Sequence, residues 1–354
     1  MSCGRDHTLV LLADGKAIGW GGDGSGRVPA STPEYCTTPA PTKAVEVLSR
    51  VPLAAVAAGE GMSLGITRSR TLTAWGANGA GVDGVLGAVA PATPLPIAPL
   101  SDVTSAAAGE FQCAAVDGDG VVRTWGLDLD GALGRHDTAF EAAPGVVPGL
   151  PPVQAIAIGK GYMIALTRTG ELHAWGSNAA GQLGAGHLHT IDAPARVPID
   201  DAVAGMSAGA SHVLAVTRTG AVMAWGSNNH GQLGRGEPAY ATRPLAVALP
   251  ERAVAVAAGM YFSLALGASG EVYAWGWNAR GQLGLPGGDR AQPVRVPALA
   301  GVTAIAAGQA HATALTDRAV GGWGSNAAGQ LGGAALMQRE PFQLIAANRE
   351  HRHG

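Results

Sequence analysis

The stretch HAWGSNAAGQLG (residues 173–184) is followed one repeat later by MAWGSNNHGQLG (residues 223–234). A tryptophan followed by glycine recurs in this phase along the whole chain, at Trp20, Trp75, Trp125, Trp175, Trp225, Trp275 and Trp323. Another glycine stands fifteen or sixteen residues before each tryptophan, at Gly4, Gly59, Gly109, Gly159, Gly209, Gly259 and Gly308. Seven copies with a period of about 50 residues predict a repeat architecture in which each unit packs on its neighbours.

Short apolar runs with glycine at their joints fill each repeat, as in AVAVAAG (residues 253–259) and EVYAWG (residues 271–276). Runs of this length and composition predict β-strands and leave no room for long helices. Five repeats carry a glycine where a tight hairpin needs a positive φ, at Gly15, Gly120, Gly170, Gly220 and Gly270. The second and seventh repeats lack it, at RSR and DRA, so we expect those turns to differ.

Four strands per repeat predict an all-β fold, a seven-bladed β-propeller with four-stranded antiparallel blades, built as one domain over residues 1–354 with 347–354 as a disordered tail. The alanine-rich strand ending in IAAG (residues 305–308) suits the crowded axis, and the tryptophans suit the space between neighbouring blades. MSCG (residues 1–4) matches the end of an inner strand, while PFQLI (Pro341–Ile345) is left over. We therefore predict that the N- and C-terminal segments share one blade and so close the ring.

Composition disfavours several classes of partner. The 354 residues carry a net charge of −3 without a basic run, which disfavours nucleic acid. No apolar run approaches the ~18 residues that cross a bilayer, so we expect no membrane span. Cys3, Cys36 and Cys113 are too few for a disulfide scaffold, which suits a reducing compartment. We expect a soluble, cytoplasmic monomer, or a secreted one if a leader precedes this chain, and the alanine and glycine bias suggests a bacterial source.

The segments GQAHATAL (residues 308–315) and WGSNAAGQLG (residues 323–332) resemble the regulator of chromosome condensation repeat family, and the likeness spans essentially the whole chain. The resemblance implies the propeller and, among bacterial members, similarity to a β-lactamase inhibitor type. The family also includes an exchange factor for a small GTPase and a plant photoreceptor. The wedge and basic tail of the exchange factor have no counterpart here, and no tryptophan follows the inner glycines as in the photoreceptor.

The loops that follow the inner glycines differ in every repeat, and the topology places them on one face together with the segments after the tryptophans. Four of the nine Phe and Tyr residues lie in these loops. Aromatic and charged side chains on a rigid scaffold are typical of a protein-binding surface, although the aromatics could instead plug the channel mouth. The predicted partner-binding residues are Arg5, Asp6, His7, Glu60, Met62, Glu110, Phe111, Lys160, Tyr162, His212, Met260, Tyr261, Phe262, Gln309 and His311.

We accordingly predict a non-enzymatic scaffold that binds a protein or peptide at this face and needs no cofactor. Two alternatives stay open: guanine-nucleotide exchange on a small GTPase, and an enzyme with its active site at the channel mouth. For the second, the mouth supplies titratable groups, but no ordered catalytic motif is present.

Several other features have a structural and a functional interpretation. The shared histidine position (His7, His212 and His311) either binds a metal or holds its loop by hydrogen bonds, and the second is simpler, so we expect no metal site. His187 and His189, with Asp192, are a weaker candidate metal site.

The insertion over residues 26–52 is either a partner-specific lip or tolerated surface. On the far face, four arginines form a ring that we expect to be a solvated rim: Arg68, Arg168, Arg218 and Arg318. We expect Cys113 to be a small buried residue.

Overall fold

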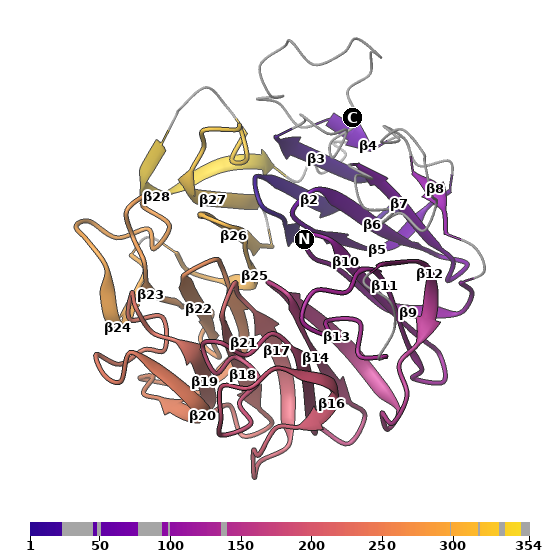
Figure 1. Ribbon diagram of the computed structural model, residues 1–354. Coiled ribbons are helices and arrows are strands. Elements are labelled where there is room, and N and C mark those ends of the chain that lie inside the picture. The colour runs from indigo at the N-terminus through magenta and orange to yellow at the C-terminus, as the bar shows by residue number, and fades with distance from the viewer. Residues whose placement is uncertain are drawn as a thin grey trace, which may run out of the picture.

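The computed structural model describes residues 1–22, 45–47, 51–76, 94–97, 100–135, 140–297, 299–317, 319–332 and 337–347. Its strands form seven four-stranded antiparallel sheets arranged in a ring (Figure 1). Within each sheet, or blade, neighbouring strands are consecutive in the chain. The predicted seven-bladed β-propeller is confirmed. In the described part of the chain, no helix is long and apolar enough to span a bilayer.

Each blade contributes one strand to each of four layers. The innermost strands are β1 Ser2–Cys3, β5 Leu53–Ala58, β9 Val103–Ala108, β13 Val153–Gly159, β17 Val203–Ala208, β21 Ala253–Ala258 and β25 Val302–Ala307. The second strands are β2 His7–Leu11, β6 Met62–Thr67, β10 Gln112–Asp117, β14 Tyr162–Thr167, β18 His212–Thr217, β22 Phe262–Gly267 and β26 His311–Thr316. The third strands are β3 Ala17–Gly21, β7 Leu72–Gly76, β11 Val122–Leu127, β15 Leu172–Gly176, β19 Val222–Ser227, β23 Val272–Gly276 and β27 Ala319–Ser325. The outer strands are β4 Val45–Val47, β8 Leu95–Pro96, β12 Phe140–Val146, β16 Ile191–Arg196, β20 Tyr240–Val247, β24 Arg290–Arg295 and β28 Met337–Ala347.

The repeated tryptophans lie at the seams between blades, as predicted. All seven are fully buried. Five donate their indole N–H to a backbone carbonyl of the preceding blade at 2.8–2.9 Å: Trp20, Trp175, Trp225, Trp275 and Trp323. Each indole therefore buries a large apolar surface and satisfies its one polar group at the same time.

In the fourth to seventh blades the asparagine and glutamine of the repeat hold the loop after the tryptophan. In the fourth blade the side-chain oxygen of Asn178 accepts the N–H of Leu183, and its amide donates to the carbonyls of His187 and His189 at 2.9 Å. The carbonyl of Gln182 then accepts the indole of Trp225 in the next blade. The repeated residues of WGSNAAGQLG therefore encode both the loop and the seam.

The prediction that the terminal segments share one blade is wrong. β1 is the innermost strand of the first blade, and β28 is the outermost strand of the seventh. The reason is that each outer strand pairs with the third strand of its own repeat, which contains the tryptophan, and not with the following repeat. Ala195 of β16, for example, pairs with Ala174 of β15. Both terminal blades are thus complete by themselves.

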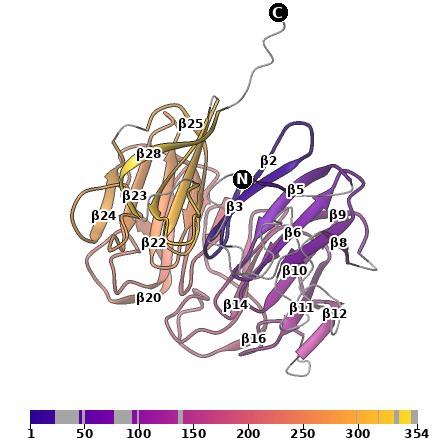
Figure 2. The same cartoon turned by 90° about the horizontal axis from the view of Figure 1, so that it is seen from above.

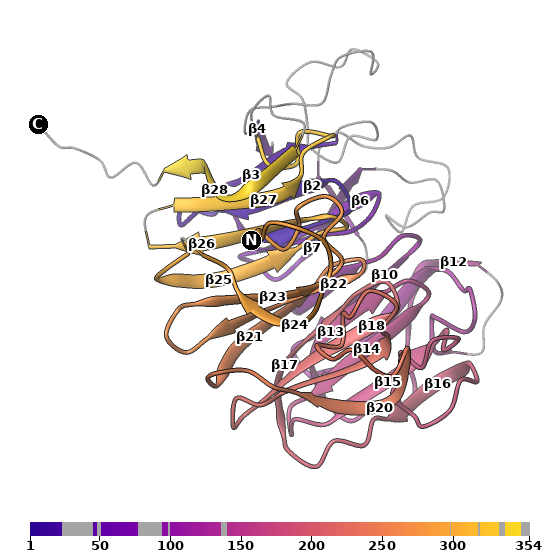
Figure 3. The ribbon, with the colours of Figure 1, turned by 90° about the vertical axis from the view of Figure 1, so that its left-hand side faces the viewer.

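The ring closes through the same contact that joins the other blades. The indole of Trp20 donates to the carbonyl of Gln330 at 2.8 Å, and the thiol of Cys3 lies 3.1 Å from the hydroxyl of Thr313. Figures 2 and 3 show the indigo first blade beside the gold seventh blade. No special closing device is needed because this seam repeats the chemistry of the rest.

The five predicted hairpin glycines adopt φ values between 82° and 95°, which confirms those turns. The expectation of a different turn in the second blade is wrong. Arg70 adopts φ 61° there and donates its N–H to Thr67 at 2.9 Å, as Gly170 does to Thr167 at 3.0 Å. An arginine tolerates this conformation at modest cost, and its guanidinium also pairs with Asp102 at 2.7 Å.

The far-face arginines bridge the blades. Arg68, Arg168 and Arg218 are exposed, yet each donates to a backbone carbonyl in the hairpin of the preceding blade. Cys113 is fully buried, with its sulfur 3.2 Å from that of Met62, as a small core residue should be. Arg318, Cys36, residues 348–354 of the predicted tail and most of the 26–52 insertion lie outside the described residues.

Candidate functional site

Each inner glycine is followed by a loop of three residues whose positions have different surroundings. The first position lines the mouth of the central channel, the second lies on the surface of the loop face, and the third begins the second strand of the blade. We call the surface that carries these loops and the segments after the tryptophans the loop face. The fifteen predicted residues divide among these three positions.

The third-position residues are buried in the seams between blades. Their exposed fractions are 0–2%, at His7, Met62, Gln112, Tyr162, His212, Phe262 and His311. All of these except Gln112 were predicted to bind a partner, and their burial leaves no exposed side chain for that role. Tyr162 and Phe262 fill the space between blades, so they neither face a partner nor plug the channel mouth. No partner can reach these side chains while the blades stay packed.

The position of these side chains explains the invariant inner glycine of the repeat. A Cβ at Gly159 would overlap the ring of Tyr162, and one at Gly259 would overlap the ring of Phe262. The phenol of Tyr162 points into the next blade, 2.9 Å from the carbonyl of Gly209 and 2.8 Å from that of His212. Burial raises the pKa of this phenol, so it stays a neutral donor.

The histidines at the third position make cross-blade hydrogen bonds. The Nε2 atom of His212 lies 3.0 Å from the Ser263 hydroxyl, and that of His311 lies 3.1 Å from the Thr8 hydroxyl. Each hydroxyl gives its own proton to a backbone carbonyl, so it accepts the imidazole N–H. Burial lowers the pKa of His212 to about 4 and that of His311 to about 3, so both rings are neutral at physiological pH.

The contacts at the shared histidine position fit the hydrogen-bonding interpretation of these residues. His7 contacts the hydroxyl of Ser63 at 3.0 Å, so each imidazole meets a hydroxyl of the neighbouring blade. The rings of His187 and His189 lie 5.5 Å apart on an exposed loop. Within the described ranges, no three His, Cys, Asp or Glu residues gather in a way that could hold a metal ion.

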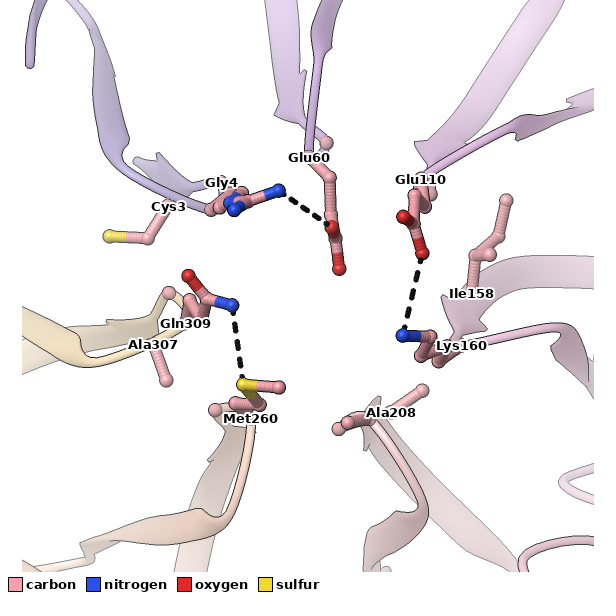
Figure 4. Close-up of a pocket in the computed structure, with 18 of the residues that line it drawn as sticks. Cys3, Gly4, Glu60, Glu110, Ile158, Lys160, Ala208, Met260, Ala307 and Gln309 are labelled. Carbon is pink, nitrogen blue, oxygen red and sulfur yellow. Dashed lines mark hydrogen bonds and ion pairs between the residues drawn. The ribbon is translucent and has the colours of Figure 1, made fainter. Parts of the chain in front are cut away.

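The first-position residues surround a cavity of about 120 Å³ at the channel mouth (Figure 4). Its wall is otherwise built from the glycines and small side chains of the inner strands. The mouth residues are Arg5, Glu60, Glu110, Lys160, Ala210, Met260 and Gln309. A cavity of this size is smaller than the roughly 300 Å³ at which small-molecule sites begin.

Charge is distributed unevenly around the mouth. Arg5 lies 3.9 Å from Glu60, and Lys160 lies 3.9 Å from Glu110, whereas the remaining three mouth residues are uncharged. Burial, and then the neighbouring Glu110, raise the pKa of Glu60. These distances exceed hydrogen-bonding range, so neither pair is arranged for proton transfer.

The second-position residues include the most exposed aromatic groups of the loops. Tyr261 packs with two side chains from the segments after the tryptophans: its ring centroid lies 5.4 Å from that of His230 and 6.0 Å from that of Trp277. Asp289 accepts from His230 Nδ1 at 2.8 Å and from the N–H of Asn278 at 2.9 Å. We call His230, Tyr261 and Trp277 the aromatic cluster; it spans the seam between the fifth and sixth blades.

Sequence reasoning named Tyr261 but missed its two companions. Of the eight tryptophans, Trp277 is the one that lies outside the repeat phase. It stands where other repeats carry a serine, as at Ser177 and Ser227. That departure from the repeat could have identified Trp277 as a candidate site residue. No sequence signal pointed to His230, because its proximity to Tyr261 depends on how adjacent blades meet.

Phe111 is 37% exposed and lies at the second position of the third blade. Asp6 is half-buried at the same position of the first blade. Of the fifteen predicted residues, Asp6, Phe111, Tyr261 and all the mouth residues except Ala210, which was not predicted, thus remain accessible on the loop face.

Comparisons with known proteins agree with this architecture. The RCC1-like domain family matches residues 79–352, and the regulator of chromosome condensation (RCC1) repeat matches residues 1–27. A human protein, "Probable E3 ubiquitin-protein ligase HERC3", is 37% identical over 81 residues, which are 23% of this chain and 8% of that protein. The chain therefore corresponds to a small part of that relative.

Solved structures of low sequence identity share the fold. Human WBSCR16 superposes with a TM-score of 0.83 at 22% identity, covering 94% of each chain. Yeast RCC1 (Prp20), solved bound to Kap60, gives 0.81 at 22% identity over 96% of this chain and 84% of that one. Prp20p of Saccharomyces cerevisiae, whose binding to Gsp1p and histones was studied with its structure, gives 0.80 at 22% identity, covering 95% and 87%.

Proposed function

Since the chain belongs to the RCC1-like domain family, a propeller family, we propose that it is a non-enzymatic scaffold that binds a protein or peptide on its loop face. The aromatic cluster carries this proposal. Tyrosine and tryptophan are among the side chains that supply most of the binding energy in protein interfaces, and Tyr261 and Trp277 are both partly exposed. Here they lie together on loops, although the seven in-phase tryptophans are all buried.

The loops that carry the cluster are held rigidly. The N–H of Met260 donates to the carbonyl of Gln309 at 3.2 Å, and that of Ala210 donates to Met260 at 3.3 Å. The N–H of Trp277 donates to the carbonyl of Tyr261 at 2.9 Å. A partner therefore meets ordered side chains and loses little conformational entropy in fixing them, which favours affinity.

The relatives support a protein partner without identifying it. Yeast RCC1 (Prp20) has been solved bound to Kap60, and the binding properties of Prp20p towards Gsp1p and histones have been studied. These partners belong to that protein, and at 22% identity the likeness conveys the fold alone.

The test replaces the cluster by residues that the repeat itself uses. A binding partner captured from the source organism is titrated against wild-type protein and the Trp277→Ser variant, in which serine restores the residue of the fourth and fifth repeats. We expect at least tenfold weaker binding, since loss of a central aromatic contact commonly costs about 2 kcal/mol. Thermal unfolding should change little because Trp277 is partly exposed on the loop face, unlike the fully buried in-phase tryptophans.

A control on the opposite face is Leu12→Ala. Leu12 is 38% exposed and lies in the hairpin between β2 and β3, at the end of the blade away from the loop face. Its loss should leave affinity unchanged. Equal affinity of the Trp277→Ser variant and wild type would remove the aromatic cluster from the interface.

The two alternative functions have less support. Nucleotide exchange rests on the likeness of fold to yeast RCC1, and no feature of the loop face favours it specifically. At the channel mouth the two charged pairs, Arg5 with Glu60 and Lys160 with Glu110, are each 3.9 Å apart, which gives catalysis no specific support. The cytoplasmic location and the monomeric state stay predictions.

A further inference from the structure

A second opening on the loop face lies at the seam between the third and fourth blades. It is a cleft of about 290 Å³ lined by Phe111 and Leu129 of the third blade and by Gly161 and Ser177 of the fourth. Phe111 is 37% exposed and Leu129 is 48% exposed. Two large apolar side chains beside such small residues leave an apolar surface open to solvent.

The repeat structure shows what this kind of cleft accommodates. Two repeats later, from Trp175 to Trp275, the positions of Gly161 and Ser177 are occupied by Tyr261 and Trp277. The backbones correspond, because Ser177 donates to the Gly161 carbonyl at 2.8 Å and Trp277 donates to that of Tyr261 at 2.9 Å.

The side chains at these positions therefore decide whether the seam is filled. At the fifth and sixth blades the chain's own phenol and indole rings lie 6.0 Å apart there and form the aromatic cluster. At the third and fourth blades, glycine and serine leave the equivalent space empty. The group that fits this space is thus an aromatic ring, and here it must come from another molecule.

Charge adds a second requirement. Glu110, Asp130 and Lys160 border the cleft, and Lys160 lies 3.9 Å from Glu110. Asp130 is exposed and pairs with no cation among the residues that the structure describes. The cleft therefore carries one net negative charge, which favours a cationic group beside the ring.

We propose that this cleft binds a peptide segment of a partner protein that presents an aromatic side chain next to a lysine or arginine. The ring occupies the space above Gly161 and Ser177, between Phe111 and Leu129. The basic group lies toward Asp130. This site is separate from the aromatic cluster, so the proposal does not require that the cluster bind a partner.

The probe is a phage-displayed library of random 12-residue peptides, selected on the immobilised full-length protein. We expect enriched peptides to share an aromatic residue within one or two positions of a lysine or arginine. The best peptide is then synthesised with a fluorophore and titrated by fluorescence anisotropy. Enrichment of acidic peptides, or of peptides without an aromatic residue, would overturn the proposal.

Three variants locate the binding. Ser177→Trp installs the residue of the sixth repeat and should fill the cleft, which weakens peptide binding at least tenfold. Phe111→Ser installs the residue that the fifth repeat carries at that position, Ser211, and should weaken binding through loss of a wall; it serves if the tryptophan variant does not fold. Asp130→Asn should weaken binding about threefold at low salt and less at high salt, because its effect is electrostatic.

Trp277→Ser separates this proposal from the proposed function. It alters the aromatic cluster and should leave the selected peptide's affinity unchanged. If the peptide binds wild type and both Ser177→Trp and Phe111→Ser equally, the cleft is not its site and the inference fails. If only Trp277→Ser weakens the peptide, the aromatic cluster binds it, and the inference fails while the proposed function stands.

Discussion

The buried histidines at the seams predict how stability depends on pH. His212 and His311 are fully buried, and each donates its Nε2 proton to a hydroxyl of the next blade. A second proton would have to bind Nδ1, which in both rings is buried and has no hydrogen-bond partner among the described residues. The folded protein therefore resists protonation of either ring.

The size of the effect follows from the two pKa values. An unfolded histidine titrates near 6.5, whereas the folded values are about 4 for His212 and about 3 for His311. Between these values the unfolded chain binds a proton that the folded chain does not, so stability is complete above about pH 6.5 and falls as the pH falls. At about pH 4.5, two units lower, each ring costs about 2–3 kcal/mol and the pair about 5 kcal/mol.

The test replaces both histidines by glutamine, which the third blade already buries at the equivalent Gln112. The free energy of unfolding is measured by urea denaturation at pH 7.5 and 4.5 for wild type and for the His212→Gln/His311→Gln variant. The wild type should lose about 5 kcal/mol more than the variant over this interval, and each single variant should account for about half.

Carboxylates titrate in both proteins, so the difference between them isolates the histidines. As a converse, Gln112→His should add pH dependence of the same sign. Equal losses in wild type and double variant would mean that the folded protein protonates these rings freely, and the account of neutral cross-blade hydrogen bonds would be refuted.

Three further outcomes are expected. Tyr162→Phe should lower the free energy of unfolding by about 1–2 kcal/mol, because the carbonyl of Gly209 loses its phenol donor, and partner affinity should not change; the reverse pattern in urea denaturation and titration would return Tyr162 to the interface. Gly159→Ala should destabilise by about 1–3 kcal/mol because its Cβ overlaps the Tyr162 ring, whereas Gly236→Ala, which meets open space, should be neutral in the same assay. A fluorescent nucleotide-release assay with small GTPases should show no acceleration; a clear acceleration would establish the exchange alternative.

The number of blades, their phase and the place of the tryptophans could be predicted from the sequence because each repeat solves the same packing problem. A seam needs a large buried ring with a satisfied N–H, and a loop needs a side chain that bonds its own backbone. Those demands recur at every seam, so the same letters recur about every 50 residues. The closing of the ring was mispredicted because the sequence does not show to which neighbour the outer strand bonds.

The candidate site could be predicted only as a region. The sequence placed aromatic side chains in the loops after the inner glycines, but it ranked Tyr162 and Phe262 with Tyr261. The difference is a matter of direction: the third loop residue begins a strand, so its side chain enters the seam, while the residue before it faces solvent. Consecutive residues of one loop thus have opposite roles.

The sequence by itself determined a propeller, its repeat boundaries and the face on which its variable residues gather, because periodic positions report the local forces common to all blades. The tertiary structure alone decided that His230, Tyr261 and Trp277 form one cluster and that Phe111 and Leu129 border an open cleft. Those groupings arise where two blades meet, and contact across a seam depends on side chains far apart in the chain.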